Sequence, residues 1–206
     1  MGLVHYTATL SPTKRELVRA WLPSQSWAPG ARVKKVAEYR FDDPEGEVGV
    51  ETILWRTDDG AVLQTPLTYR AAPLDGGEDF LVGTSEHSEL GSRWVYDGCG
   101  DPVWAAAMTE AILTGGAQAQ MVIERDGQLV DVPARIQVRG SGSHGAPVPG
   151  ITSVDSVTDE GPVTTVSAGS VTLLLPRVVG TSVSGDATLA GSAGDHLSRS
   201  AAITSA

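Results

Sequence analysis

The densest group of reactive side chains lies in residues 83–104, GTSEHSELGSRWVYDGCGDPVW. Ser85, His87 and Asp97 are the residue types of a nucleophile, a general base and an orienting acid. On a strand, Ser85 and His87 would share a face, but their Cα atoms would stand roughly 6–7 Å apart, too far for a direct pair. The segment also lacks the strand-to-helix turn of a nucleophile elbow. We therefore interpret it as a β-hairpin, and keep hydrolase chemistry on these three residues as an alternative.

Aromatic and charged side chains near this hairpin are better candidates for binding than for catalysis. Tryptophan combines a large apolar face with a polar N–H group, which suits it to stacking on sugars. Three of the five tryptophans lie on apolar helix or strand patterns and are expected in the core. The candidate ligand or interaction surface consists of the remaining two and their charged neighbours: Trp27, His87, Arg93 and Trp94.

The sequence indicates neither a metal site nor a nucleotide site. Its four histidines are scattered, and only Cys99 offers a thiolate. Asp42, Asp43 and Glu45 supply carboxylates, but DDPEG is more simply interpreted as a turn. GSGSHG at residues 140–145 fits G-x-G-x-x-G, yet prolines follow where the dinucleotide fingerprint requires a helix. We expect no cofactor and no metal.

Charge and composition restrict the partners. The 206 residues carry a net charge of −10, which disfavours nucleic acid and anionic membrane surfaces as partners. The N-terminus lacks the basic and apolar regions of a secretory signal, and no apolar run is long enough to span a membrane. A single cysteine fits a reducing compartment. We expect a cytoplasmic protein.

Two helices and a series of antiparallel strands must position these side chains. The first helix is predicted at residues 11–22, where Ser11 can cap the N-terminus and the apolar residues form one stripe. The second is predicted at residues 101–114, with Asp101 and Pro102 at its start and Gly115 directly after its end. Between and after the helices, apolar and polar residues alternate with a period of two, and turn residues interrupt the alternation. Strands are predicted at residues 33–41, 47–55, 61–70, 79–88, 92–97, 118–125, 129–139 and 170–179. This is an α+β domain with an antiparallel meander.

The aromatic residues indicate where the main core lies. All Trp, Tyr and Phe residues occur at or before Trp104, so the principal domain is predicted at residues 1–139. Residues 140–180 are interpreted as a linker and additional strands that pack on that domain. Residues 181–206 are rich in Gly, Ser, Thr and Ala, and we expect a mostly disordered tail.

Several short motifs resemble one known family. LPSQSW at residues 22–27 resembles the L-P-x-Q-x-W entry of the N-terminal cap domain of actinobacterial maltokinases. TPLTYRAAPL and VYDGCGDPVW resemble the P-L strand and the Y-D-x-x-x-D-P passage of that cap. GTSEHSELGSRWVYDG resembles short stand-alone relatives of the cap. The resemblance covers roughly residues 5–140, and it implies a cystatin-like fold in which a helix packs on a curved antiparallel sheet.

The resemblance also implies a function. In maltokinases the cap precedes a kinase body that binds ATP and phosphorylates maltose, but this sequence has no phosphate-cradling loop onto which kinase residues could be carried. The family's basic glycine-rich loop is replaced by PGAR at residues 29–32. We therefore expect a non-catalytic cap-like module, a protein-interaction or accessory factor near maltose, trehalose and α-glucan metabolism. The alternatives are a carbohydrate-binding module that uses Trp27 or Trp94, and a small enzyme of α-glucan metabolism.

Overall fold

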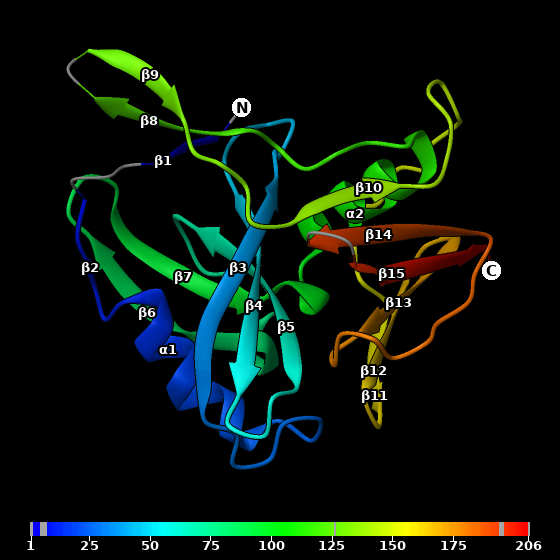
Figure 1. Cartoon of the computed structure of the whole chain (residues 1–206), viewed down its shortest axis with the longest axis horizontal. Coiled ribbons are helices and arrows are strands. Elements are labelled where there is room, and N and C mark those ends of the chain that lie inside the picture. The colour runs from blue at the N-terminus through cyan, green and yellow to red at the C-terminus, as the bar shows by residue number, and fades with distance from the viewer. Residues whose placement is uncertain (1, 5–7, 126, 194–195, 206) are drawn as a thin grey trace.

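The computed structural model describes residues 2–4, 8–125, 127–193 and 196–205. They form two six-stranded sheets and a three-stranded sheet, with two α-helices and short 3₁₀ turns (Figure 1). The 3₁₀ turns are η1 (Leu22–Ser24), η2 (Glu78–Phe80) and η3 (Gly98–Gly100). The prediction of an α+β fold with a curved antiparallel sheet and two helices is confirmed. The single predicted meander is instead divided among three sheets.

The first sheet is antiparallel and has the order β2–β6–β7–β5–β4–β3. Its strands are β2 (Leu10–Ser11), β3 (Val33–Phe41), β4 (Gly49–Thr57), β5 (Val62–Arg70), β6 (Leu81–His87) and β7 (Gly91–Asp97). β3, β4 and β5 follow one another as the sequence predicts, but β5 pairs with β7 rather than with β6. The β6–β7 hairpin thus turns back against the meander, and β2 pairs with β6 to form the far edge of the sheet.

The second sheet is also antiparallel, in the order β10–β14–β15–β13–β12–β11. Its strands are β10 (Gln137–Gly140), β11 (Ser156–Glu160), β12 (Val163–Ala168), β13 (Val171–Pro176), β14 (Ala187–Ala193) and β15 (His196–Ser205). The third, small sheet places β8 (Met121–Arg125) between a parallel strand, β1 (Gly2–Val4), and an antiparallel strand, β9 (Gln128–Asp131).

The C-terminal residues differ from the predicted disordered tail. β14 and β15 lie inside the second sheet, where β15 pairs with both β13 and β14. Ala201, Ala202 and Ile203 are at most 2 % exposed, so their small side chains are packed rather than solvated. These small side chains would bury little apolar area in an isolated segment. The segment is nevertheless ordered here, because neighbouring strands satisfy its backbone hydrogen bonds on both sides.

Helix α1 (Lys14–Trp21) covers one face of the first sheet. Thr13 caps it in place of the predicted Ser11: its side chain accepts from Glu16 N, and the Glu16 side chain accepts from Thr13 N. This capping box satisfies two of the free N–H groups of the first turn. Leu17 and Val18 are buried against the sheet.

Helix α2 (Pro102–Thr114) starts and ends where the sequence predicts. Asp101 caps it by accepting from Val103 N at 2.9 Å, and Gly115 ends it with a left-handed φ of 70°. The Asp101 carboxylate is fully buried and also accepts two hydrogen bonds from Arg70, at 2.7 and 2.6 Å. The cap therefore also ties α2 to the end of β5.

The GSGSHG segment closes the other end of α2. Gly142 N donates to Ile112 O at 2.9 Å and Ser143 N donates to Leu113 O at 3.0 Å, which satisfies carbonyls of the last helical turn. A Cβ atom on Gly142 would lie 1.8 Å from Leu113 O, and one on Gly140 would lie 1.9 Å from Ala111 O. These glycines are required because the chain backbone approaches the helix backbone closely.

The two helices lie on opposite faces of the first sheet. α1 packs on a cluster that includes Ile53, Trp55 and Leu67. α2 lies between the other face and the second sheet. The core residues shared by these three elements are Tyr39, Phe41, Val50 and Leu54 from the first sheet, Trp104, Met108 and Ile112 from α2, and Leu173 and Leu189 from the second sheet. Neither helix in the described residues is long and apolar enough to cross a bilayer.

Candidate functional site

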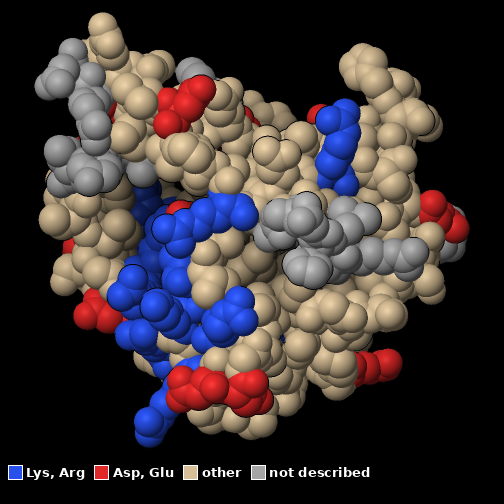
Figure 2. All heavy atoms as spheres, viewed as in Figure 1, with Lys and Arg blue, Asp and Glu red and all other residues tan. Residues whose placement is uncertain are grey.

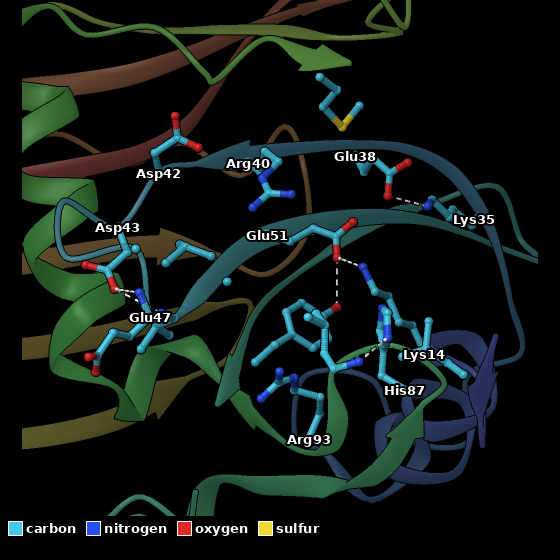
Figure 3. A pocket seen from close by; sticks show the side chains of 18 residues that line it. Lys14, Lys35, Glu38, Arg40, Asp42, Asp43, Glu47, Glu51, His87 and Arg93 are labelled. Carbon is cyan, nitrogen blue, oxygen red and sulfur yellow. Dashed lines mark hydrogen bonds and ion pairs between the residues drawn. The ribbon is translucent and has the colours of Figure 1, made fainter. Parts of the chain in front are cut away.

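A pocket of about 720 Å³ opens on the face of the first sheet that α1 covers only in part. The eight residues of α1 span roughly 12 Å, whereas a nine-residue strand spans roughly 30 Å. The helix therefore shields only part of the sheet face, and beyond its N-terminus the inward-facing residues are charged. Because the sheet is curved, β3 and β7 form opposite walls of this pocket, and β4 and β5 form its floor (Figure 3).

Glu51 is the central side chain of the pocket floor. It is only 8 % exposed, and its Oε2 accepts from Lys14 Nζ at 2.6 Å and from the Tyr69 hydroxyl at 2.8 Å (Figure 3). Lys14 Nζ also lies 4.5 Å from the centre of the Tyr69 ring. Burial alone would raise the pKa of Glu51, but the charge of Lys14 and the hydrogen bonds from Glu38 and Lys14 outweigh it and lower that pKa. Glu51 is therefore ionised in the folded protein.

Glu38 is held in the opposite protonation state. Burial, followed by the hydrogen bond and the negative charge of Glu51, raises the pKa of Glu38 to about 7, against the opposing effect of its ion pair with Lys35. The two carboxyl groups thus share one proton in mildly acidic solution, and Glu38 acts as the hydrogen-bond donor. Adjacent carboxylates whose pKa values are driven apart occur at many functional sites.

Two arginines extend into the pocket from its walls. Figure 3 shows Arg40 on β3 and Arg93 on β7 on either side of Glu51, and both line the pocket. Arg40 Nε is shielded from solvent and has no hydrogen-bond partner among the described residues. For Arg93, too, no side-chain hydrogen bond or ion pair is formed within the described part of the chain. The pocket therefore contains guanidinium groups whose donors are available to a ligand.

One face of the protein is basic, although the protein is acidic overall. Figure 2 shows Lys and Arg side chains gathered over the face along which β3 runs in Figure 1. On the β3–β4 pair, Lys34 and Arg56 are directly opposed in the register and both are exposed. Like charges in this position repel each other, so the face is electrostatically suited to a negatively charged partner.

The structure separates the predicted nucleophile, base and acid. Ser85 is buried and donates to Pro12 O at 2.7 Å, whereas His87 Nδ1 accepts from the backbone N–H groups of the β6–β7 turn. Asp97 lies at the far end of β7 and pairs with Arg177 at 2.6 Å. The three side chains do not converge, and each has a structural contact of its own. The hairpin interpretation of this segment fits the structure.

The four residues predicted to form an interaction surface lie in different places in the structure. His87 and Arg93 both line the charged pocket. Trp94 is half-buried and is paired with Thr84 and Arg70 within the sheet. Trp27 is only 7 % exposed, so its interpretation as an exposed platform differs from the structure. Its ring is covered by the guanidinium of Arg177, which lies 4.6 Å from the ring centre.

The acidic turn and the cysteine have structural explanations. The Asp43 carboxylate accepts hydrogen bonds from the N–H groups of Glu45, Glu47 and Val48, which closes the β3–β4 turn. Among the described residues no three His, Cys, Asp or Glu side chains are arranged to hold a metal. Burial is the main cause that raises the pKa of Cys99 well above its usual range, so this thiol stays protonated.

Sequence reasoning missed most of the pocket. Lys14, Glu38, Arg40, Glu51 and Tyr69 come from α1 and from three strands, and only the register brings them together. The charged residues within the nine-residue strands were the one feature of the sequence that indicated a polar site on the sheet. A β-bulge between Lys35 and Ala37 hides that signal, because it shifts the alternation of faces along β3.

One comparison with known proteins matches the same part of the chain. Residues 21–101 match the family described as the maltokinase N-terminal cap domain. The matched region runs from the end of α1 to the cap of α2 and contains all of β3 to β7. A search of curated proteins found no match. Residues 21–101 are therefore similar to the maltokinase N-terminal cap domain.

Proposed function

We propose that this protein is a non-catalytic cap-type module that acts as an accessory factor by binding a protein of maltose, trehalose or α-glucan metabolism. The observation that carries this proposal is the family match over residues 21–101. The separation of Ser85, His87 and Asp97 into unrelated structural contacts supports a binding role over a hydrolytic one.

The basic face on β3 and β4 is the proposed contact surface. Lys34 and Arg56 are exposed and adjacent, and no acidic side chain of the described chain forms an ion pair with either. A partner with an acidic surface would relieve their mutual repulsion. β3 is also an edge strand of its sheet, so a partner can approach it from the side.

Direct binding measurements test this proposal. The protein is immobilised, and purified enzymes that make or consume maltose, trehalose and α-glucan are passed over it in biolayer interferometry. We expect at least one enzyme to bind, and the double charge reversal Lys34→Glu/Arg56→Glu to abolish binding. The double reversal Arg135→Glu/Arg139→Glu, at two exposed positions in and beside β10, is the matched control and should bind as the unaltered protein does. Failure of every enzyme to bind would contradict the proposal.

A further inference from the structure

We propose that the charged pocket between β3, β7 and the N-terminus of α1 binds a phosphate group, which Arg40 and Arg93 hold. This inference goes beyond the proposed accessory function. It rests on the geometry and the ion pairs of the pocket and does not require a protein partner.

The first argument concerns the two arginines. A guanidinium group presents its N–H donors in a planar fork that matches two oxygens of a phosphate. Arg40 and Arg93 enter the pocket from different strands (Figure 3), and both are half-buried. Arg40 Nε is removed from solvent without an acceptor in the described structure, which is unfavourable unless a ligand supplies one. An oxyanion in the pocket would satisfy this donor.

The second argument concerns the acidic residues that also line the pocket. The charge of Glu51 is balanced by Lys14, and Glu38 forms an ion pair with Lys35. The carboxylate of Asp43 accepts three backbone N–H groups of its own turn. The acidic side chains of Asp42 and Glu47, which also line the pocket, are exposed to solvent. The two cations that remain for a ligand are therefore Arg40 and Arg93.

The third argument concerns size. A volume of about 720 Å³ lies within the range of roughly 300–1,000 Å³ that is usual for sites of small molecules. It exceeds the volume of one phosphate ion, so the pocket can hold either free phosphate or a small phosphorylated molecule. Tyr69 and Glu38 also line the pocket and provide polar groups beside the two arginines.

Isothermal titration calorimetry with the full chain tests the proposal and separates the two sources of phosphate. Inorganic phosphate, glucose 6-phosphate and glucose are titrated in turn near neutral pH and at low salt. We expect glucose 6-phosphate or inorganic phosphate to bind, and glucose to give no heat at the same concentration. Tighter binding of the ester assigns the pocket to a phosphorylated small molecule, and equal binding assigns it to free phosphate.

Variants identify the site. Arg40→Gln and Arg93→Gln should each weaken binding roughly tenfold or more, since each removes charge-assisted hydrogen bonds. Arg139→Gln is the control, because it removes one exposed positive charge on the second sheet. Circular dichroism and thermal unfolding verify that each variant is folded. Absence of phosphate binding, equal binding of glucose, or affinities unchanged by both pocket variants would overturn the proposal. None of these outcomes depends on whether a protein partner is found.

Discussion

Arg177 and Asp97 form an ion pair of 2.6 Å in the protein interior, although 80 residues separate them in the sequence. Arg177 directly follows β13 of the second sheet, and Asp97 ends β7 of the first. The Arg177 side chain is 1 % exposed, and its Nε donates to Thr164 at 2.6 Å. Backbone contacts reinforce this junction, because Gln64 N donates to Arg177 O at 2.9 Å. The second sheet is therefore joined to the cap-like sheet by a buried guanidinium group, each of whose three nitrogens donates a hydrogen bond.

Replacement of Arg177 by Met should strongly destabilise the protein. Asp97 would be left buried without its counter-charge, which typically costs about 3–5 kcal/mol of unfolding free energy. Urea denaturation followed by circular dichroism measures the loss. The exposed Arg139→Met on β10 is the control and should change stability by no more than about 0.5 kcal/mol.

The double variant Arg177→Met/Asp97→Leu distinguishes the lost pair from lost packing. Removal of both charges should recover part of the stability, since no buried charge is left unpaired. A loss below about 1 kcal/mol for the single variant would contradict the view that the pair is desolvated and structural.

Gly142→Ala should destabilise the packing of the GSGSHG segment against the last turn of α2. The new Cβ atom would lie 1.8 Å from Leu113 O, so either the loop or the last helical turn must move. Overpacking of this kind typically costs about 1–3 kcal/mol, which a thermal melt detects as a lowered Tm. Gly150→Ala is the matched control, because its Cβ would meet no atom within 4 Å. Equal melting temperatures for the two variants would show that the close approach is absent.

The Glu38–Glu51 pair predicts a specific dependence of stability on pH. The pKa of Glu38 is raised from its ordinary value of 4.5 to about 7, mainly by burial and then by Glu51. Between these values the folded protein binds a proton that the unfolded chain does not. The stabilisation from Glu38 is therefore complete below about pH 4.5 and is lost as the pH rises through 7. Glu51, with its lowered pKa, loses its stabilising contribution only as the pH falls below its ordinary value.

Glu38→Gln isolates this effect, because the amide keeps a hydrogen-bond donor but does not titrate. Between about pH 5 and pH 8 the loss of unfolding free energy should be smaller in the variant by roughly 1–2 kcal/mol. The measurement is a set of urea titrations across this pH range. Glu47→Gln, an exposed change at the edge of the pocket, should keep the loss seen in the unaltered protein. Parallel pH profiles for Glu38→Gln and the unaltered protein would argue against a shared proton.

Local signals were sufficient to predict α2 and the strands of the cap-like meander. Asp101–Pro102 and Gly115 specify the ends of α2 through the capping hydrogen bond and a left-handed φ, neither of which depends on distant residues. β3 and β5 follow from their alternation and from the turn residues between them. The N-cap of α1 lies two residues after the predicted Ser11. Ser11 and Thr13 are both acceptable caps, but only Thr13 forms a capping box with Glu16.

The C-terminal strands and the pocket depend on long-range contacts, which composition does not reveal. β15 is a central strand of small residues, and Ala201 and Ala202 are buried only because β13 and β14 flank them. The pocket depends on the shortness of α1 and on the curvature that brings β3 to face β7. Both are properties of the assembled sheet, so the positions of Arg40 and Glu51 within their strands do not by themselves indicate a shared site.

The Nε–Hε resonances of the arginines in a ¹H–¹⁵N spectrum test the phosphate site most directly. Upon addition of glucose 6-phosphate or inorganic phosphate, the resonances of Arg40 and Arg93 should shift together and saturate. That of Arg177, whose Nε already donates to Thr164 at 2.6 Å, should stay in place and serves as the internal control. Unchanged Arg40 and Arg93 resonances, or shifts confined to exposed arginines such as Arg139, would contradict a phosphate site in this pocket.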